Sequence, residues 1–525
     1  MTLQAQAATD RWSTFDVVSY ATDPENMLPT RIRRWAEAEP ERPFLIEAAT
    51  ERTASYGQLW EQARTWVRWL REEGVTAGDF VATVLPSSID AAAVWLALGA
   101  IGAIEVPVNP ELVGDFAAHV IKDASPTLCL GRPDLVGNLR ACCPDLRIVE
   151  VERDGRFLDG VQPADIETLP GPEGVACIIY TSGTTGPAKG VVIRWAQFAA
   201  VVGRMPMEES DVSQASSPMF HVTGRTPLVV MADVGGLVVL RERFSRSEVL
   251  EDARRYRISV GTIIASLVLT LPPSPTDEDN AFRYVFTGHS PLLCEQWGER
   301  FGVRGYDCYG STEIGFPIVR LEPPVDVERL WMGKIRRGWE GKVVDADGRT
   351  AADGESGELW IRAGSRLMLM GRYLNQPDAT AAAFDGDWYK TGDIVIRHGD
   401  GNYEFLDRAR DTIRRLGENI SSTAVETAVE KHPDIALAAV VGVPDQVAGR
   451  EVLLVVEPEP EARVEEEEFY AWLRTAVPKH ALPRYLMVVG ALRRTPTGKV
   501  LKQTLLDEVD LSAAWTPPSA RRSSV

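Results

Sequence analysis

The stretch Tyr180-Thr-Ser-Gly-Thr-Thr-Gly-Pro-Ala-Lys-Gly190 comes directly after an apolar, strand-like run at residues 175–180. Its glycines allow backbone N–H groups to approach an anion closely, its hydroxyl side chains are further donors, and Lys189 adds a positive charge. The stretch has no Gly-Lys-Ser/Thr step and is therefore not a Walker A loop. A flexible Ser/Thr/Gly linker is the alternative, but such linkers seldom follow a buried strand with hydroxyls so dense. We predict a loop that holds the phosphates of a nucleotide through Thr181, Ser182, Gly183, Thr184, Thr185, Gly186 and Lys189.

Helix-like and strand-like patterns alternate before and after this loop. Residues 56–70 have apolar side chains at helical spacing, residues 80–85 and 104–108 are short apolar runs typical of buried strands, and residues 89–98 predict a helix. Further strand-like runs occur at 238–240 and 260–264. This alternation predicts an α/β protein in which parallel or mixed sheets are layered with helices.

A chain of 525 residues is too long for a single core, so we expect more than one domain. Residues 339–362 change to short strands and turns. Residues 412–515 carry a compact α+β pattern, with helices near 423–431 and 465–473 and strands near 436–443 and 451–457. We predict a large domain over 1–406 with a β-rich part at about 339–406, a hinge at 407–411, a small mobile domain over 412–515 and a frayed tail over 516–525.

Charge and cysteine content limit the classes of partner. Lys and Arg total 56 against 75 Asp and Glu, and the net charge of −19 argues against nucleic-acid binding. The six cysteines follow no zinc or disulfide spacing, which suits a reducing cytosol. Residues 1–11 lack the order of a signal peptide, and the longest apolar run, 91–104, is shorter than the roughly 20 residues of a bilayer span. We expect a cytoplasmic protein without a membrane span, in which 91–104 is a buried helix that turns into a loop.

The phosphate loop belongs to a series of motifs that follow one another from about Ser55 to Leu501. They are Ser55-Tyr-Gly-Gln-Leu59, Gly102-Ala-Ile-Glu-Val-Pro-Val-Asn-Pro110, Tyr309-Gly-Ser-Thr-Glu313, Gly357-Glu-Leu-Trp-Ile361, Trp388-Tyr-Lys-Thr-Gly-Asp393, Asp407-Arg408, Gly417-Glu-Asn419 and Pro496-Thr-Gly-Lys499. In their joint order the chain resembles the adenylate-forming enzymes, a superfamily of acyl-CoA ligases, luciferases and the adenylation domains of peptide synthetases. Within the acyl-CoA ligase branch, residues 407–408 and 417–421 are most similar to crotonobetaine-type and medium-chain ligases.

The resemblance implies a reaction in two halves. A carboxylate attacks the α-phosphate of ATP to give an acyl-adenylate and pyrophosphate, and the thiol of coenzyme A then displaces AMP. Mg²⁺ is implied at Glu313, with Thr184 assisting, because Mg²⁺ prefers oxygen ligands and substrate phosphates. The other nucleotide contacts implied are Tyr309 against adenine, Thr312 near the α-phosphate, Asp393 and Arg408 at the ribose, and Gly288, His289, Ser290, Gly310 and Ser311.

The C-terminal motifs imply movement of the small domain. In the family, the lysine at the position of Lys499 enters the active site and neutralises charge in the adenylation transition state. The small domain then rotates about a hinge, at Arg410 here, and brings Gly417 and Glu418 to the coenzyme A side. The family usually has Asp or Lys where this chain has Arg410, and often a second glycine at Leu416. Without the resemblance, Lys499 would be read as a solvated surface lysine.

The segment Pro218-Met-Phe-His-Val-Thr-Gly224 carries information on the class of acid. Amino-acid-activating relatives place an aspartate there, whereas this chain has Phe220-His221, as acyl- and aryl-CoA ligases commonly do. The resemblance therefore implies an acid without an α-amino group and a pocket at His221, Val222, Arg225, Gly288 and Gly310. His221 gates this pocket or acts catalytically, or is a structural histidine. Arg225 pairs with a polar group of the substrate or points to solvent.

His289 stands where the family usually has a glycine or alanine, so we expect an altered adenine edge or acyl pocket. Two alternatives to an acyl-CoA ligase stay open. One is a freestanding enzyme that loads the acyl group onto a separate carrier protein, and the other is an inactive binding protein of the same fold. Glu313, Asp393 and Lys499 argue against the inactive protein. The identity of the acid and the oligomeric state do not follow from the sequence.

Overall fold

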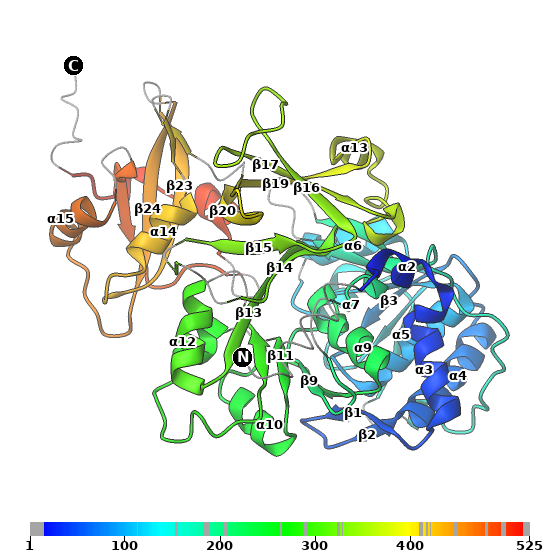
Figure 1. Cartoon of the computed structure of the whole chain (residues 1–525). Helices are drawn as coiled ribbons and strands as arrows, with labels where there is room; N and C mark the ends of the chain where they lie inside the picture. Colours follow the sequence, from blue (N-terminus) through cyan, green and yellow to red (C-terminus); the bar gives the residue numbers. More distant parts are fainter. Residues whose placement is uncertain are drawn as a thin grey trace. The chain divides into compact units, whose positions relative to one another are not determined.

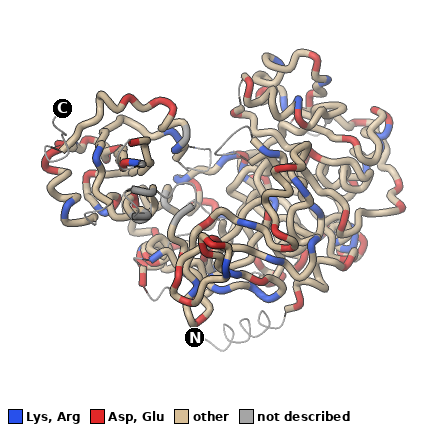
Figure 2. The backbone as a smooth tube through the Cα atoms, turned by 90° about the horizontal axis from the view of Figure 1, so that it is seen from above, with Lys and Arg blue, Asp and Glu red and all other residues tan. Residues whose placement is uncertain are grey.

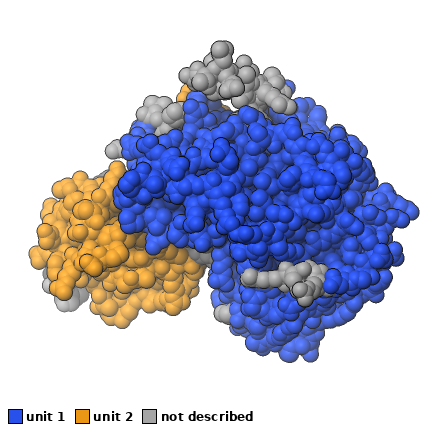
Figure 3. Space-filling view, turned by 90° about the horizontal axis from the view of Figure 1, so that it is seen from below, with its two compact units in different colours: residues 1–341, 360–390 blue, residues 342–359, 391–525 orange. Residues whose placement is uncertain are grey.

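The computed structural model describes residues 15–112, 114–152, 156–181, 188–203, 207–262, 265–287, 291–322, 326–327, 329–408, 413–415, 418–420, 422–445, 449–477, 481–494 and 500–517. The chain divides into two compact units. Unit 1 consists of Met1–Gly341 and Trp360–Lys390, and unit 2 of Lys342–Leu359 and Thr391–Val525 (Figure 3).

A six-stranded sheet of unit 1 contains the strands on both sides of the predicted phosphate loop. Its order is β6-β5-β3-β4-β7-β8, and the pairs are parallel except for the antiparallel pair β7/β8. The strands are β3 (Phe80–Val84), β4 (Ile104–Pro107), β5 (Leu128–Gly131), β6 (Ile148–Glu150), β7 (Val175–Thr181) and β8 (Lys189–Arg194). They alternate in the chain with the helices α4 (Tyr56–Glu72), α5 (Ile89–Ile101), α6 (Gly114–Ala124) and α7 (Gly137–Cys142) (Figure 1).

Helices α4 and α5 follow from their sequences by simple rules. Ser55 and Gln58 form a reciprocal capping box that starts α4, whose apolar face is buried. Helix α5 is buried nearly all round and ends at Gly102, whose φ of +82° is in the left-handed region that favours glycine. The expectation that residues 91–104 form a buried helix turning into a loop is therefore confirmed.

A second sheet in unit 1 carries the later motifs. Its strands run in the order β15-β14-β13-β12-β11-β9-β10-β1-β2, parallel from β13 to β1 and antiparallel at both ends. They are β1 (Pro43–Glu47), β2 (Thr53–Ser55), β9 (Val212–Ala215), β10 (Leu237–Leu240), β11 (Val260–Thr262), β12 (Tyr284–Phe286), β13 (Arg304–Ser311), β14 (Gly315–Arg320) and β15 (Trp331–Ile335). Helices of this unit include α2 (Val17–Thr22), α3 (Leu28–Ala38), α8 (Trp195–Ala199), α9 (Val222–Val234), α10 (Val249–Arg255), α11 (Ala265–Leu269), α12 (Pro291–Phe301) and α13 (Pro377–Ala382).

Four further strands, β16 (Trp339–Val344), β17 (Ser356–Ala363), β19 (Trp388–Arg397) and β20 (Asn402–Arg408), follow one another in the pairing order, and β18 (Phe384–Asp385) pairs with β19. The division between the units passes through β16, β17 and β19, so residues 342–359 and 391–406 group with the C-terminal residues. The sequence analysis assigned them to the large domain. Strand order relates the two segments, because β16, β17, β19 and β20 are successive neighbours in the sheet and keep residues 342–359 beside residues 391–408. The hinge at 407–411 stays a prediction.

The C-terminal part has the α+β pattern expected from the sequence. The long antiparallel pair β23 (Ile435–Asp445) and β24 (Gly449–Pro458) is flanked by β21 (Ile413–Arg415), β22 (Glu418–Ile420) and β25 (Tyr485–Val488), with helices α14 (Ser422–Val429), α15 (Glu466–Ala476) and α16 (Lys502–Glu508). Val440, Leu454 and Leu473 are among the fully buried residues of its core.

The predicted fold class is confirmed: a large α/β part followed by a small α+β part. Acidic and basic residues are interspersed over both units in Figure 2. Among the described residues, we find no helix that combines the length and the apolar composition needed to cross a bilayer.

Candidate active site

The two ends of the predicted phosphate loop meet in the structure. Strands β7 and β8 form a hairpin in which Thr181 is the register partner of Lys189, and the Thr181 hydroxyl lies 3.5 Å from the Lys189 carbonyl oxygen. The segment therefore connects two antiparallel strands, unlike a P-loop, which leads from a strand into a helix. The predicted phosphate-binding residues Ser182, Gly183, Thr184, Thr185 and Gly186 lie outside the described residues.

Helix α6 supports the base of this hairpin. Nε2 of His119 lies 2.9 Å from the Ala188 carbonyl oxygen, and the Tyr180 hydroxyl donates to the Asp123 carboxylate at 2.7 Å. Asn375 donates to the Asp123 carbonyl at 2.7 Å. Burial raises the pKa of Tyr180 far above its usual value, so the phenol stays a donor. The sequence analysis missed these supports because nothing local links residues 119 and 123 to the loop.

Tyr373 contacts both Lys189 and Glu313, the predicted Mg²⁺ ligand. The Tyr373 hydroxyl donates to Glu313 Oε1 at 3.1 Å, and Lys189 Nζ lies 5.0 Å from the centre of the Tyr373 ring. A second phenol, Tyr389, lies 3.3 Å from the Tyr373 oxygen. Burial raises the pKa of Tyr373 above its usual value, and Glu313 raises it further, so the hydroxyl remains protonated beside the carboxylate.

Backbone pairing holds this arrangement together. Residues 371–374 run along β8, with the Gly371 amide donating to the Val192 carbonyl at 2.8 Å, and the Met370 amide donates to the Glu313 carbonyl at 2.7 Å. The same segment therefore joins the β7/β8 hairpin to the turn between β13 and β14 that carries Glu313. Tyr389 stood inside a quoted motif, but Tyr373 gave no sequence signal.

A tight turn between β13 and β14 presents the residues from Tyr309 to Glu313. A Cβ on Gly310 would lie 1.8 Å from the Gly315 carbonyl oxygen, so only glycine fits there. The Glu313 amide donates to the Ser311 hydroxyl at 3.3 Å, and Gln197 donates to the Thr312 carbonyl at 2.7 Å. Tyr309 is buried, whereas Ser311, Thr312 and Glu313 are half-buried. The structure thus brings Thr181, Lys189, Thr312 and Glu313 into one connected framework.

The predicted gating segment, residues 218–224, consists of a turn at 218–221 followed by the first residues of α9, 222–224. The His221 amide donates to the Pro218 carbonyl at 3.0 Å, and the Gly224 amide donates to the His221 carbonyl at 3.1 Å. The His221 ring packs against Phe220, and its Nε2 is buried without a hydrogen-bond partner among the described residues. Burial lowers the pKa of His221 to about 4, so the ring is neutral near pH 7. Val222, predicted in the acyl pocket, is half-buried in the first turn of α9.

This shift predicts a pH dependence of stability. Because the folded-state pKa of His221 lies below the ordinary 6.5, the unfolded chain binds this proton more tightly. The contribution of the neutral His221 ring to the free energy of unfolding is fully present above about pH 6.5 and is lost as the pH falls toward 4. We expect the wild-type chain to lose about 2–3 kcal/mol more stability between pH 7 and pH 4 than His221→Gln. Denaturant unfolding at the two pH values checks this, and equal losses in both chains would contradict it.

Arg225 is buried and has an acidic partner inside the protein. Its side chain is fully buried, and Nη1 forms an ion pair of 2.6 Å with Oε2 of Glu105 on β4. The interpretation that Arg225 points to solvent is therefore wrong. Glu105 balances its charge inside the protein, and the predicted pairing with a polar group of the substrate stays a prediction.

Unit 2 holds the two residues predicted at the ribose. Asp393 on β19 and Arg408 on β20 are register partners in the antiparallel ladder. Asp393 is buried, and its amide donates to the Thr391 hydroxyl at 3.1 Å. The β19/β20 ladder therefore places their backbones opposite each other, and their role at the ribose stays a prediction.

Several predicted residues lie outside the described residues: Gly288, His289, Ser290, Arg410, Gly417 and Lys499. For Arg408 and Glu418, only the backbone is described. The flanks of the Lys499 segment are joined by a bridge between Arg494 and Val500. Close by in the chain, Lys502 pairs with Glu426 at 2.8 Å and donates to the Ser422 hydroxyl at 2.7 Å.

Comparisons with known families agree with this framework. The family model described as "AMP-binding enzyme" matches residues 32–374, and the model described as "AMP-binding enzyme C-terminal domain" matches residues 424–499. The chain belongs to the AMP-binding enzyme family. The predicted adenylate-forming family is thereby confirmed.

Curated relatives of this AMP-binding enzyme are CoA ligases of similar length. It is 27% identical over 502 residues to a sulfoacetate–CoA ligase of Cupriavidus necator, covering 92% of this chain and 97% of the relative. It is 28% identical over 484 residues to a crotonobetaine/carnitine–CoA ligase of Salmonella typhimurium, covering 86% and 93%. The acyl-CoA ligase branch predicted from the motifs is confirmed.

Solved structures show the same fold as this AMP-binding enzyme. An o-succinylbenzoate CoA synthetase from Bacillus subtilis, in complex with its acyl-adenylate intermediate, has a TM-score of 0.79 at 24% identity and covers 90% of this chain and 97% of its own. A benzoate CoA ligase from Burkholderia xenovorans has a TM-score of 0.81 at 21% identity and covers 91% and 99%.

Proposed function

We propose that this AMP-binding enzyme is an ATP- and Mg²⁺-dependent acyl-CoA ligase. A carboxylate oxygen of the acid attacks the α-phosphorus of ATP, and pyrophosphate leaves. The sulfur of coenzyme A then attacks the acyl carbon, the thiol proton passes to solvent, and AMP leaves. The observation that carries the proposal is that Lys189 and Glu313 both contact Tyr373, at the base of the β7/β8 hairpin. The first step joins two anions, so positioned charges supply most of the catalysis.

The residues present fit a Mg²⁺ ion. Glu313 is a half-buried carboxylate, and its Oε1 accepts a hydrogen bond from the Tyr373 hydroxyl. Mg²⁺ is usually bound by one or two protein carboxylates together with substrate phosphates. When bound, Mg²⁺ would neutralise phosphate charge. Glu313 would hold it, with Thr184 as the second proposed ligand.

The nucleoside contacts are part of the same proposal. Tyr309 would stack on adenine, Thr312 would donate to the α-phosphate, and Asp393 would accept from both ribose hydroxyls, since a carboxylate has two oxygens for the purpose. The register pairing of Asp393 with Arg408 supports a joint role at the ribose.

The small domain would contribute different residues to the two halves of the reaction, adenylation and thioester formation. Lys499 would bring an ammonium to the phosphates in the first half, and Gly417 and Glu418 would line the coenzyme A side in the second, after rotation about the hinge near Arg410. The match of the C-terminal family model to residues 424–499 supports the presence of this domain.

A panel of acids with ATP and Mg²⁺ tests the proposal. Because the relatives act on sulfoacetate and on crotonobetaine or carnitine, the panel contains acids with a sulfonate or a quaternary ammonium beside aliphatic and aromatic acids. We expect AMP, pyrophosphate and an acyl-CoA, each identified by mass spectrometry. Products formed only with a carrier protein would favour the loading enzyme, and no pyrophosphate with any acid would favour the inactive binding protein.

We also propose a cytoplasmic location. All six cysteines lie in the described part of the chain and are free thiols. Burial raises the pKa of Cys129 and of Cys177 to about 12, which keeps these thiols protonated and inert. Free cysteines of this kind suit a reducing compartment.

A further inference from the structure

Glu105 and Arg225 form a buried ion pair across two elements far apart in the sequence. Glu105 lies on β4 in the six-stranded sheet, and Arg225 in the first turn of α9, directly after the gating segment 218–224. Their side chains are 3% and 0% exposed, and Arg225 Nη1 lies 2.6 Å from Glu105 Oε2. The Thr83 hydroxyl donates to the other Glu105 oxygen at 2.6 Å.

Such a pair is a poor source of stability. Removing two charges from water costs as much as their attraction returns, and apolar side chains of similar volume often serve equally well. The guanidinium here lies 4.4 Å from the centre of the Trp95 ring, in apolar surroundings. A role other than stability is therefore the better explanation of why both charges are present.

The guanidinium makes a third contact that supplies such a role. Arg225 Nε donates to the Met219 carbonyl at 2.6 Å. The turn bonds of the segment, from His221 to Pro218 and from Gly224 to His221, are local. The bond to Met219 instead ties the segment, through Arg225 and Glu105, to the interior of the six-stranded sheet. A planar guanidinium can hold a carboxylate and a carbonyl at fixed angles, which an ammonium cannot do as well.

We propose that Glu105 and Arg225 are positioning residues that hold the segment 218–224, and with it the His221 ring, in the orientation needed to bind the acid. The inference rests on the proposed function, in which this segment borders the acyl pocket. His221 presents a neutral ring with a free Nε2, and a group of this kind binds a substrate only if its orientation is maintained.

The decisive variant replaces both charges with apolar side chains of similar size, Glu105→Leu with Arg225→Met. Removing one partner alone would leave a buried charge and destabilise the fold, whereas removing both avoids this. We expect a Tm within about 5 °C of the wild type, a kcat/KM for the acid lower by about 10–100-fold, and a KM for ATP within about twofold. If the pair only stabilised the fold, the double substitution would not lower kcat/KM for the acid while leaving the KM for ATP nearly unchanged.

A second variant, Arg225→Lys, keeps a cation beside Glu105 but has no Nε–H for Met219. Diethyl pyrocarbonate modification, read by mass spectrometry, reports on His221 directly, with the other five histidines as references. We expect His221 to react several-fold faster in both variants than in the wild type. If the double variant does not fold, the His221 reactivity of Arg225→Lys alone tests the inference.

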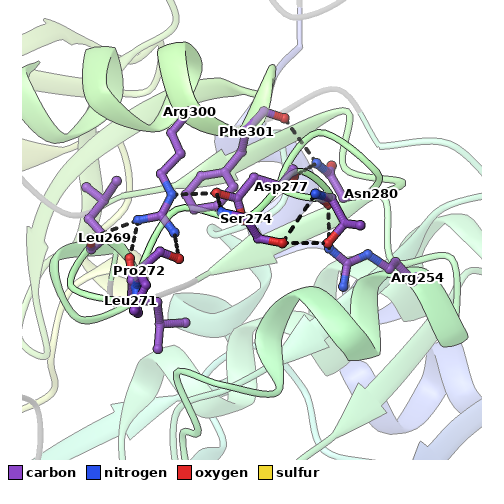
Figure 4. A network of polar contacts seen from close by, with 10 residues as sticks. Arg254, Leu269, Leu271, Pro272, Ser274, Asp277, Asn280, Arg300 and Phe301 are labelled. Carbon is purple, nitrogen blue, oxygen red and sulfur yellow. Dashed lines mark hydrogen bonds and ion pairs between the residues drawn. The ribbon is translucent and has the colours of Figure 1, made fainter.

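A matched control lies in the network of Figure 4. Arg300 pairs with Asp277 at 2.8 Å and donates to the carbonyls of Leu269, Leu271 and Pro272. We expect Asp277→Leu with Arg300→Met to leave the His221 reactivity and the KM for the acid unchanged. Unchanged His221 reactivity and acid kinetics in the Glu105/Arg225 variants would overturn the inference. The diethyl pyrocarbonate measurement needs no turnover, so it tests the positioning of His221 even if the wild type forms no pyrophosphate. Absence of pyrophosphate would refute the proposed function and not this inference.

Discussion

Lys499→Ala is expected to lose adenylation while keeping thioester formation from a supplied acyl-adenylate. The proposed role of Lys499 is to bring positive charge to the phosphates where negative charge builds up in the transition state. Removing such a group typically lowers the rate by about 100–1,000-fold. Thioester formation, the second half of the reaction, involves no attack on phosphorus. We therefore expect its rate to change by less than about threefold, far less than the rate of adenylation.

The two halves are measured separately, by ATP–pyrophosphate exchange and by thioester formation from synthetic acyl-adenylate with coenzyme A. The exposed Lys431, in the same unit, gives a control for charge removal in Lys431→Ala. Exchange at the wild-type rate in Lys499→Ala would contradict the role given to this lysine, and equal loss of both halves would show that the small domain no longer folds or moves.

Glu313→Gln is expected to raise the Mg²⁺ concentration needed for adenylation and to lower kcat/KM by about 100-fold at limiting Mg²⁺. The amide keeps the shape of the carboxylate and can still accept from the Tyr373 hydroxyl, but it lacks the charge that a hard cation requires. A Mg²⁺ titration of ATP–pyrophosphate exchange measures the effect.

Tyr373→Phe is the matched control for this change. It removes the 3.1 Å hydrogen bond to Glu313 but keeps an aromatic ring beneath Lys189. We expect a smaller loss, of about tenfold, because the carboxylate keeps its charge and loses only one orienting partner. A wild-type Mg²⁺ dependence in Glu313→Gln would refute the assignment of the metal ligand, whatever Tyr373→Phe does.

Much of the fold follows from local patterns. The capping residues Ser55 and Gln58, the apolar face of α4 and the left-handed Gly102 are features of short stretches, and short stretches decide where helices begin and end. The motifs likewise identified the family before any contact was known. The grouping of residues 342–359 with 391–406 was not predictable in the same way, because β17 and β19 are neighbours in the sheet although α13 and β18 lie between them in the chain.

The sequence by itself therefore determined the family and the α/β class, and it supplied the residues proposed to surround ATP, since each is recorded in contiguous motifs. The tertiary structure alone decided which of those residues share a partner. Lys189 and Glu313 meet only because residues 371–374 pair with β8 and carry Tyr373 between them. Arg225 looked like a surface or substrate-binding arginine until folding brought it to Glu105, 120 positions earlier in the chain. The physical reason is that ion pairs and aromatic contacts depend on distance in space, whereas a sequence records only distance along the chain.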